Sequence, residues 1–458
     1  MHALLLSLAL AAPALPSATA ASILAQQAEG AVVQTMSLDE AFAAMEANNP
    51  DLQTMAAAID DADAAAQASL AAVKPMVTVS ATYTLNNEEA LLDMGEAFAG
   101  IGQALEQATG QPADLGDTGG ATTIQPLQSL TASAQVQVPL FAANAYADIK
   151  AARVSVDSSK ANRESLEIQL RGALRNAAWL AGAAASFVNV SEQAVGNAAA
   201  HAERTERLVE AGRATRLSLN QAKLQVLQRK NDLLSAKAEL AKAQLAMGVL
   251  IGVDGPVAIT LPDVAPAVSI PPAEDAVAQG LRDRPEIAAK RSDEKAARLR
   301  VRSARMAYLP TLMGTFGGNA STADYVTGLN YAWQAGLTLS WNAYVGGSRR
   351  ASKKRAEAGL RMARAERHRQ ELTVRQEVLD ARRELELARA KYRLAVEEVA
   401  VARDAAASAE RTFAEGQSSS LDVLDALDNA FSAELRREQA KAQAAAAAVQ
   451  LDTARGLR

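Results

Sequence analysis

The sequence predicts an α+β membrane protein in which long antiparallel helices are joined to four amphipathic β-strands. Three observations predict it: an apolar but aromatic-poor composition, a set of elements that occurs twice, and two alternating polar and apolar stretches in each half. Apolar residues make up 49% of the 458 residues, yet only 4% are aromatic. Much of the apolar content is alanine, the best helix former. This composition favours long, closely packed helices over a thick globular core.

The chain is a tandem duplication. Matched pairs recur at fixed spacings: Pro50 and Pro285, Pro75 and Pro310, Gly212 and Gly416, and Leu217 and Leu421. The members of each proline pair lie 235 residues apart, and each leucine follows its glycine by five residues. A proline-rich segment, 252–271, separates the two halves. Repeats of this size are structural units, so both halves are expected to fold alike.

The repeat pattern predicts the following organisation. Residues 1–20 are a signal peptide, 21–36 an N-terminal extension, 37–251 the first repeat, 252–271 a linker in the equatorial region and 272–458 the second repeat. The first repeat comprises a helix pair, strands at about 76–85 and 130–138, a long helix 142–211 and a return helix 217–251. The second comprises a helix pair, strands at about 311–318 and 333–341, a long helix 348–415 and a return helix 421–458.

The N-terminus resembles a secretory signal. Leu4–Ala12 is a short apolar core, and Ala18–Ala20 is a small-residue cleavage site. No Lys or Arg precedes the apolar core, so either the amino group and His2 suffice or the true start lies upstream. We expect export. Past this segment no apolar run is long enough for a membrane-spanning helix.

The alternating segments predict strands with one apolar and one polar face. In 333–341, for example, Trp333, Leu337 and Leu339 alternate with Gln334 and Thr338. Such strands fit either a membrane barrel with a wet lumen or a soluble sheet with one buried face. Aromatic placement favours the barrel, because 11 of the 17 aromatic residues lie in 76–146 or 308–344, mostly near strand ends.

Four strands are too few to close a barrel, whose smallest form has about eight. An open edge in lipid leaves backbone groups without hydrogen bonds. Several chains are therefore expected to share one barrel. The helices 142–211 and 348–415 lack proline and reach roughly 100 Å at about 1.5 Å per residue. In the return helix, apolar residues seven apart support helix-on-helix packing: Leu219, Val226, Leu233, Leu240 and Met247.

Several function classes are disfavoured. The chain has no cysteine, and its histidines are His2, His201 and His368, so neither a Ser-His-Asp set nor a metal site is expected. The net charge of −5 argues against nucleic acid. No enzyme motif or cofactor site is apparent. The alternative to a channel is an exported coiled-coil adaptor or surface stalk, although a stalk has no need of four amphipathic strands.

In its motifs and their order, the chain resembles the TolC family of outer-membrane channels. Four phrases carry the resemblance: the helix ends at Asn49-Pro50 and Arg284-Pro285, the corner Val138–Phe141, the Gly346-Gly347 corner, and Gly416–Ala426. The resemblance implies a homotrimer with a shared 12-stranded barrel and a periplasmic α-helical barrel. It also implies a passive exit conduit for efflux or secretion, partnered by a periplasmic adaptor and an RND or ABC inner-membrane transporter.

The resemblance also assigns site residues. Gly212, Leu217, Gly416 and Leu421 match the tunnel tip, where the adaptor docks. Asp422 and Asp425 match the carboxylates that ring the periplasmic gate. A spacing of three places both carboxylates on one helix face. Taken without the resemblance, they are ordinary first-turn acids that the helix dipole favours.

The chain departs from the family pattern at two places. Phe413, Ser418 and Ser218 stand near the tips, where some members have charged contacts, and Arg213 and Gln417 follow the tip glycines in place of apolar residues. The insertion 86–126 has no counterpart in the second strand pair, whose loop is 319–330. The topology predicts both loops on the cell exterior, with a short helix within 90–108.

Overall fold

A computed structural model describes residues 33–92, 94–111, 122–261, 270–322 and 331–457. The predicted signal peptide lies outside these residues, as do parts of the linker and of both strand-pair loops. The chain divides into two compact units. The first comprises 1–59, 159–290 and 366–458, and the second comprises 60–158 and 291–365.

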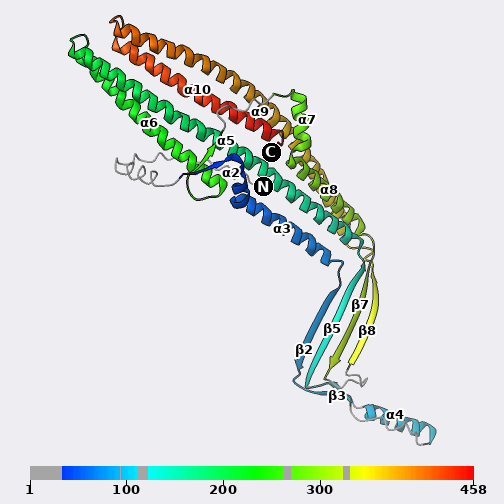
Figure 1. The fold of residues 1–458 in the computed structure, drawn as a ribbon. Coiled ribbons are helices and arrows are strands. Elements are labelled where there is room, and N and C mark those ends of the chain that lie inside the picture. The colour runs from blue at the N-terminus through cyan, green and yellow to red at the C-terminus, as the bar shows by residue number, and fades with distance from the viewer. Residues whose placement is uncertain (1–32, 93, 112–121, 262–269, 323–330, 458) are drawn as a thin grey trace. The chain divides into compact units, whose positions relative to one another are not determined.

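Outside the insertion 86–126, the elements follow the same order in both halves (Figure 1). The helices are α2 (Leu38–Asn48), α3 (Pro50–Ala71), α4 (Met94–Thr109), α5 (Ala143–Glu210), α6 (Arg216–Ile251), α7 (Ala273–Asp283), α8 (Pro285–Met306), α9 (Ser348–Ala414) and α10 (Ser420–Ala454). The strands are β1 (Gln34–Ser37), β2 (Met76–Leu85), β3 (Ala90–Leu92), β4 (Thr122–Gln125), β5 (Gln128–Phe141), β6 (Val257–Thr260), β7 (Thr311–Ser321) and β8 (Tyr331–Ser340). The predicted fold class is confirmed.

Three details differ from the sequence prediction. The segment 252–271 is not only a linker, because β6 within it pairs in parallel with β1 of the N-terminal extension. The strands β5 and β7 are longer than predicted. In β5 the extra length includes Pro139, beside an irregularity in its register with β7. Proline is tolerated at such a bulge because its missing N–H breaks no regular ladder.

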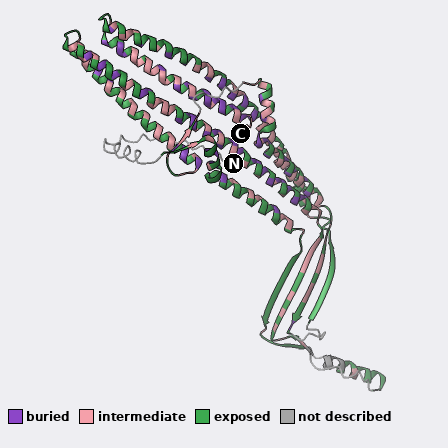
Figure 2. Ribbon diagram, viewed as in Figure 1, coloured by how far each residue is buried: buried purple, intermediate pink, exposed green. Residues whose placement is uncertain are grey.

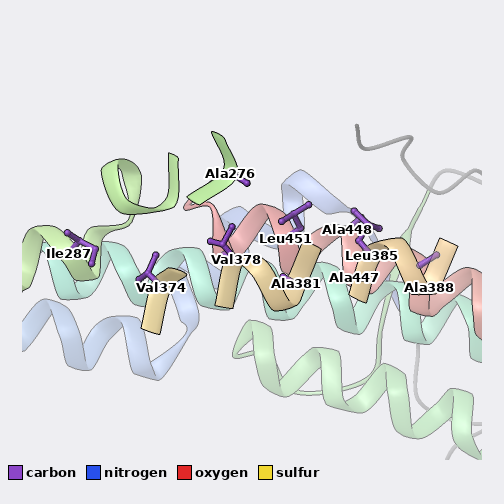
Figure 3. Close-up of a cluster of buried hydrophobic side chains, with 12 residues drawn as sticks. Ala276, Ile287, Val374, Val378, Ala381, Leu385, Ala388, Ala447, Ala448 and Leu451 are labelled. Carbon is purple, nitrogen blue, oxygen red and sulfur yellow. The ribbon is translucent and has the colours of Figure 1, made fainter. Parts of the chain in front are cut away.

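In the first unit each repeat builds its own core of small apolar side chains. Ala276, Val378, Leu385 and Leu451 belong to the second-repeat core, which α7, α9, α10 and the start of α8 form (Figure 3). The first-repeat core has the same elements, α2, α3, α5 and α6, together with β6. A smaller cluster, Trp179, Ala445 and Val449, joins α5 to α10. Alanine recurs in these cores because it lets helices approach closely.

Two glycines end the return helices in the same way. Gly252 (φ 84°) and Gly456 (φ 78°) both adopt the left-handed conformation. A Cβ on Gly252 would lie 2.6 Å from the carbonyl oxygen of Asn48, and one on Gly456 would lie 3.1 Å from that of Asp283. Asn48 and Asp283 are themselves 235 residues apart. The close approach of return helix and helix pair is thus built identically in both repeats, and it requires glycine.

The second unit contains a four-stranded antiparallel sheet in the order β2-β5-β7-β8. Directly paired residues share one face of a sheet, so the register defines its two sides. On one side lie Val79, Ala134, Gly318 and Trp333, which are cross-strand neighbours. On the other lie polar residues such as Ser80 and Ser133, whose hydroxyls are 2.7 Å apart. The sheet therefore has an apolar face and a polar face.

The insertion 86–126 forms local structure of its own. The short strands β3 and β4 pair with each other, and α4 lies between them in the sequence. This agrees with the predicted short helix within 90–108. The helix presents Ile101 and Leu105 to solvent, at 53% and 46% exposure.

Candidate functional site

The chain has two helical hairpins, α5–α6 and α9–α10. Their turns carry the residues that the sequence predicted as the tunnel tip. Gly212 (φ 70°) and Gly416 (φ 79°) each follow the end of a long helix. The N–H groups after them, of Arg213 and Gln417, donate to Leu208 and Thr412 carbonyls at 2.7 and 2.9 Å. This is the Schellman arrangement, in which the left-handed residue lets the chain leave the helix while the last carbonyls keep partners.

The N-terminus of α10 places the two predicted gate carboxylates. Ser419 is the N-cap: its backbone N–H donates to Asp422 Oδ2 at 2.8 Å, and Asp422 N–H donates to Ser419 Oγ at 3.3 Å. The backbone hydrogen bond from Ser419 lowers the pKa of Asp422, so this carboxylate is charged at neutral pH. Asp422 and Asp425 are both exposed. The capping role explains Asp422 locally, and it accounts for nothing at Asp425.

The matched position in the first repeat caps its helix without a carboxylate. Ser218 stands three residues after the N-cap Thr215, as Asp422 does after Ser419. Its N–H donates to Thr215 Oγ1 at 3.1 Å, and the two hydroxyls are 2.9 Å apart. A serine therefore suffices for the cap.

Leucines stand exposed beside both turns. Leu217 is the second residue of α6 and is 67% exposed, and Leu421 is the second residue of α10 and is 53% exposed. Burying a leucine side chain is worth roughly 1.5–3 kcal/mol relative to leaving it in water. Each hairpin end therefore carries an exposed apolar side chain that is suited to packing against another protein.

A buried histidine lies where the hairpins meet. His201 of α5 is 1% exposed, its Nε2 is 2.9 Å from Ser420 Oγ, and its ring centroid is 5.3 Å from that of Phe413. Burial, and then the nearby charge of Arg204, lower the pKa of His201, so its ring is neutral at pH 7. The Arg204–Glu410 ion pair, at 3.7 Å, lies on the same α5–α9 contact.

A second link joins α6 to α10. Arg229 is 12% exposed, and its guanidinium lies 2.6 Å from Asp428 and 2.9 Å from Asp232. The same group stacks over the Phe431 ring at 4.1 Å. Gln225 also donates to Asp428. Sequence reasoning missed this network. The one available signal was the position of Asp428, a further three residues along the face of Asp422 and Asp425.

The apolar face of the sheet is the other candidate site. On the edge strands β2 and β8, which are coloured as exposed in Figure 2, the apolar residues lie open to solvent. They include Val79 (75%), Leu337 (73%) and Trp333 (64%). Exposed apolar surface on this scale marks contact with a membrane or a partner. No helix among the described residues has an apolar stretch long enough to cross a bilayer. In the same residues, no three His, Asp or Glu side chains are grouped to hold a metal ion.

A two-faced sheet of four strands joined to two long helical hairpins defines the class of outer-membrane channel subunits. The chain belongs to the outer membrane efflux protein family, whose model matches residues 43–253 and 276–457, one segment in each half. The TolC-like identity that the motifs predicted is thereby confirmed.

Solved structures with similar folds agree with this assignment. CusC shares 17% identity with a TM-score of 0.76, each chain being covered over 92%. VceC of Vibrio cholerae shares 18% identity with a TM-score of 0.72, covering 92% of this chain and 96% of that one. MtrE of Neisseria gonorrhoeae, solved in an open state, shares 17% identity with a TM-score of 0.72, over 92% and 89%. No curated protein matches the chain.

Proposed function

We propose that three copies of this chain form an outer-membrane channel, in which each contributes four strands to one 12-stranded barrel. The observation that carries the proposal is the sheet itself. Its apolar face is exposed, and β2 and β8 each have one unpaired edge within the sheet. In lipid an unpaired edge costs several kcal/mol for each backbone group. Pairing β8 of one chain with β2 of the next removes every edge.

In this arrangement the apolar face contacts lipid and the polar face lines a water-filled lumen, the alternation typical of membrane barrels. The protein then resides in the bacterial outer membrane, and its helical hairpins extend into the periplasm as a tunnel. The channel is a passive conduit with no chemistry of its own. Energy for transport comes from an inner-membrane transporter of the RND or ABC type.

Asp422 and Asp425 form the periplasmic gate in this proposal. Three copies place a ring of like charges around the tunnel axis, where the charges repel, stay hydrated and attract cations. The first repeat supports this role, because α6 is capped by Thr215 with Ser218, and not a carboxylate, at the position that matches Asp422. The carboxylate of Asp422 is thus more than capping requires, and Asp425 takes no part in the cap.

The hairpin ends are the docking surface for a periplasmic adaptor. Gly212 and Gly416 shape the turns, and Leu217 and Leu421 supply exposed apolar side chains beside them. In the resting state of the tunnel, the His201–Ser420 and Arg229–Asp428 contacts hold the two hairpins together. An adaptor that binds the leucines and separates the hairpins would open the tunnel.

The shared barrel is tested by thiol cross-linking, which the absence of native cysteine makes clean. Ser80→Cys on β2 and Thr338→Cys on β8 both place thiols on the polar face at the two open edges. Because neighbouring strands lie about 4.8 Å apart, a short bis-maleimide should bridge adjacent protomers. We expect covalent dimers and trimers from outer membranes on a denaturing gel.

The control is Gln135→Cys combined with Thr338→Cys. Gln135 faces the same side but lies on the inner strand β5, one strand in from the β2 edge and two strands from the β8 edge. It should give no ladder of trimers. A Ser80/Thr338 variant that stays monomeric under the same conditions, with the thiols shown to be reactive, contradicts the shared barrel.

A further inference from the structure

The two repeats differ sharply in charge where the helices meet the sheet. The segments 295–310 and 348–362 contain 11 Lys and Arg and a single acid, Glu357. The matched segments of the first repeat, 60–75 and 144–158, contain three basic and five acidic residues. Both pairs form the same elements, and the whole chain has a net charge of −5. The fold therefore does not require this positive charge, and it is available for an anionic ligand.

The basic segments adjoin the end of the sheet where β8 stops and α9 begins. Trp341 directly follows β8 and donates from Nε1 to the Tyr308 carbonyl at 3.2 Å. The Arg349 guanidinium lies 5.6 Å from the centre of the Tyr308 ring and donates to the Asn342 carbonyl. Trp341 and Tyr344 are 63% and 85% exposed. Aromatic rings of this kind occupy the boundary between hydrocarbon and headgroups, so the cations begin where headgroups are expected.

A pocket of about 180 Å³ lies where the sheet of the second unit meets α5 and α8. Its apolar walls come from the end of β5, the start of α5 and the second half of α8, with Phe141, Tyr146, Leu299 and Met306. Lys150 and Arg302 complete the lining. Both cations are exposed, and among the described residues no ion pair is formed by either. An apolar cavity bordered by two free cations suits a ligand with an acyl chain and a phosphate.

A basic surface extends from this pocket along two helices. On α8, Lys295, Arg298, Arg302 and Arg305 follow one another at three- and four-residue intervals and therefore share one face. The start of α9 runs beside α8, since Arg305 reaches Glu357 at 3.8 Å and Arg364 reaches Glu294 at 3.2 Å. Clusters of Lys and Arg beside a membrane attract anionic lipid over about a Debye length.

We propose that the apolar pocket and the basic surface beside it form a binding site for an anionic phospholipid of the periplasmic leaflet. The phosphate lies between Lys150 and Arg302, part of an acyl chain occupies the apolar pocket, and the basic face of α8 and α9 attracts further headgroups. The proposal rests on the placement of the sheet in the membrane given above. A zwitterionic lipid offers the same acyl chain without net charge, and it should bind more weakly.

The test is native mass spectrometry of the full-length protein in detergent. The probe is an equimolar mixture of phosphatidylglycerol and phosphatidylcholine with identical acyl chains. We expect preferential retention of phosphatidylglycerol. In the double variant Lys150→Gln, Arg302→Gln retention should fall roughly fivefold for each cation, the factor that about 1 kcal/mol per basic residue near an anionic surface provides. The oligomer peak shows whether the variant folds.

The matched control is Lys230→Gln, Arg393→Gln, which removes the same two charges from exposed positions on α6 and α9 in the other unit. It should retain lipid as the wild type does. Equal retention of both lipids, or an unchanged double variant, overturns the proposal. Displacement by inorganic phosphate alone at equal concentration overturns it too, since that identifies a free-anion site. A failed lipid test leaves the β2–β8 cross-link intact, so the two proposals fail separately.

Discussion

The two-faced sheet makes a prediction that a one-residue change can test. Val79 and Thr78 are neighbours on β2, and both are exposed, but they lie on opposite faces. We expect Val79→Arg to block assembly of the channel and Thr78→Arg to be tolerated. Val79 is the fourth residue of the ten-residue strand, close to its middle. A new arginine there would face hydrocarbon, whereas one at position 78 would face the lumen.

The magnitude follows from depth and copy number. An arginine on the lipid face costs about 2–4 kcal/mol near the membrane midplane. Three copies per channel therefore cost roughly 6–12 kcal/mol, comparable with the whole stability of a typical domain. Changes in strand propensity are similar for the two variants, because both replace a β-branched residue on the same strand. They cancel in the comparison.

The assay is the fraction of protein in purified outer membranes that migrates as a heat-labile trimer. Val79→Arg should lose most of this species, while Thr78→Arg and a Val79→Leu control keep it. Equal assembly of the two arginine variants would refute the assignment of faces. So would a reversed order, in which position 78 is the sensitive one.

Three further predictions concern the helical part. Arg229→Ala removes charged hydrogen bonds worth about 1–3 kcal/mol and should loosen the tip; cells should then admit a bulky antibiotic, whereas the exposed Lys230→Ala should not change susceptibility. Gly252→Ala places a Cβ 2.6 Å from a backbone oxygen at φ 84°, so it should lower the free energy of unfolding by about 1–3 kcal/mol and with it the thermal midpoint. Gly359→Ala, where no atom lies within 4 Å of the added Cβ, should leave the midpoint unchanged. Burial lowers the pKa of His201 from its ordinary value of 6.5, so as the pH falls the unfolded chain takes up a proton before the folded one does. The free energy of unfolding should therefore fall as the pH drops below about 6.5. Thermal melts at pH 7.5 and 5.5 should show this loss in the wild type and not in His201→Gln.

Periodicity accounts for what the sequence could predict. The alternation in β2 and β8 is regular, and the long helices contain no proline, so local pattern alone indicates their type. The strand β7 gave a weaker signal because Gly314, Gly317 and Gly318 interrupt its apolar residues. The register explains Gly317, since a Cβ there would lie 3.2 Å from the Ala134 carbonyl oxygen. Close backbone approach is a tertiary property that local pattern does not report.

The elements that sequence reasoning missed depend on distant partners. The strand β1 has four residues and lies 223 residues before its partner β6, since Gln34 pairs with Val257. Neither segment alternates long enough to indicate a strand. The Arg229–Asp428 link joins residues 199 apart on two polar helix faces. A charged residue on such a face looks like any solvated one until the fold supplies its partner.

The duplication separates what folding requires from what function adds. Both repeats keep the glycine turns, the left-handed helix ends at Gly252 and Gly456, and small apolar cores, because each repeat must solve the same packing problem. They diverge in charge. Asp422 and Asp425 correspond to Ser218 and Gln221 in the first repeat, 204 residues earlier.

The same divergence appears at the other end of the long helices, where the second repeat has 11 basic residues and the matched segments of the first repeat have three. The first repeat forms the same helices and turns without these charges, so the shared backbone design does not by itself require them. In a channel of three such chains, six hairpins of one backbone design would alternate in charge around the axis. Exchanging Asp422 and Asp425 for the Ser and Gln of the first repeat should therefore leave thermal stability unchanged and reduce cation selectivity in planar-bilayer conductance. A variant that melts at lower temperature with unchanged selectivity would return both carboxylates to a purely structural role.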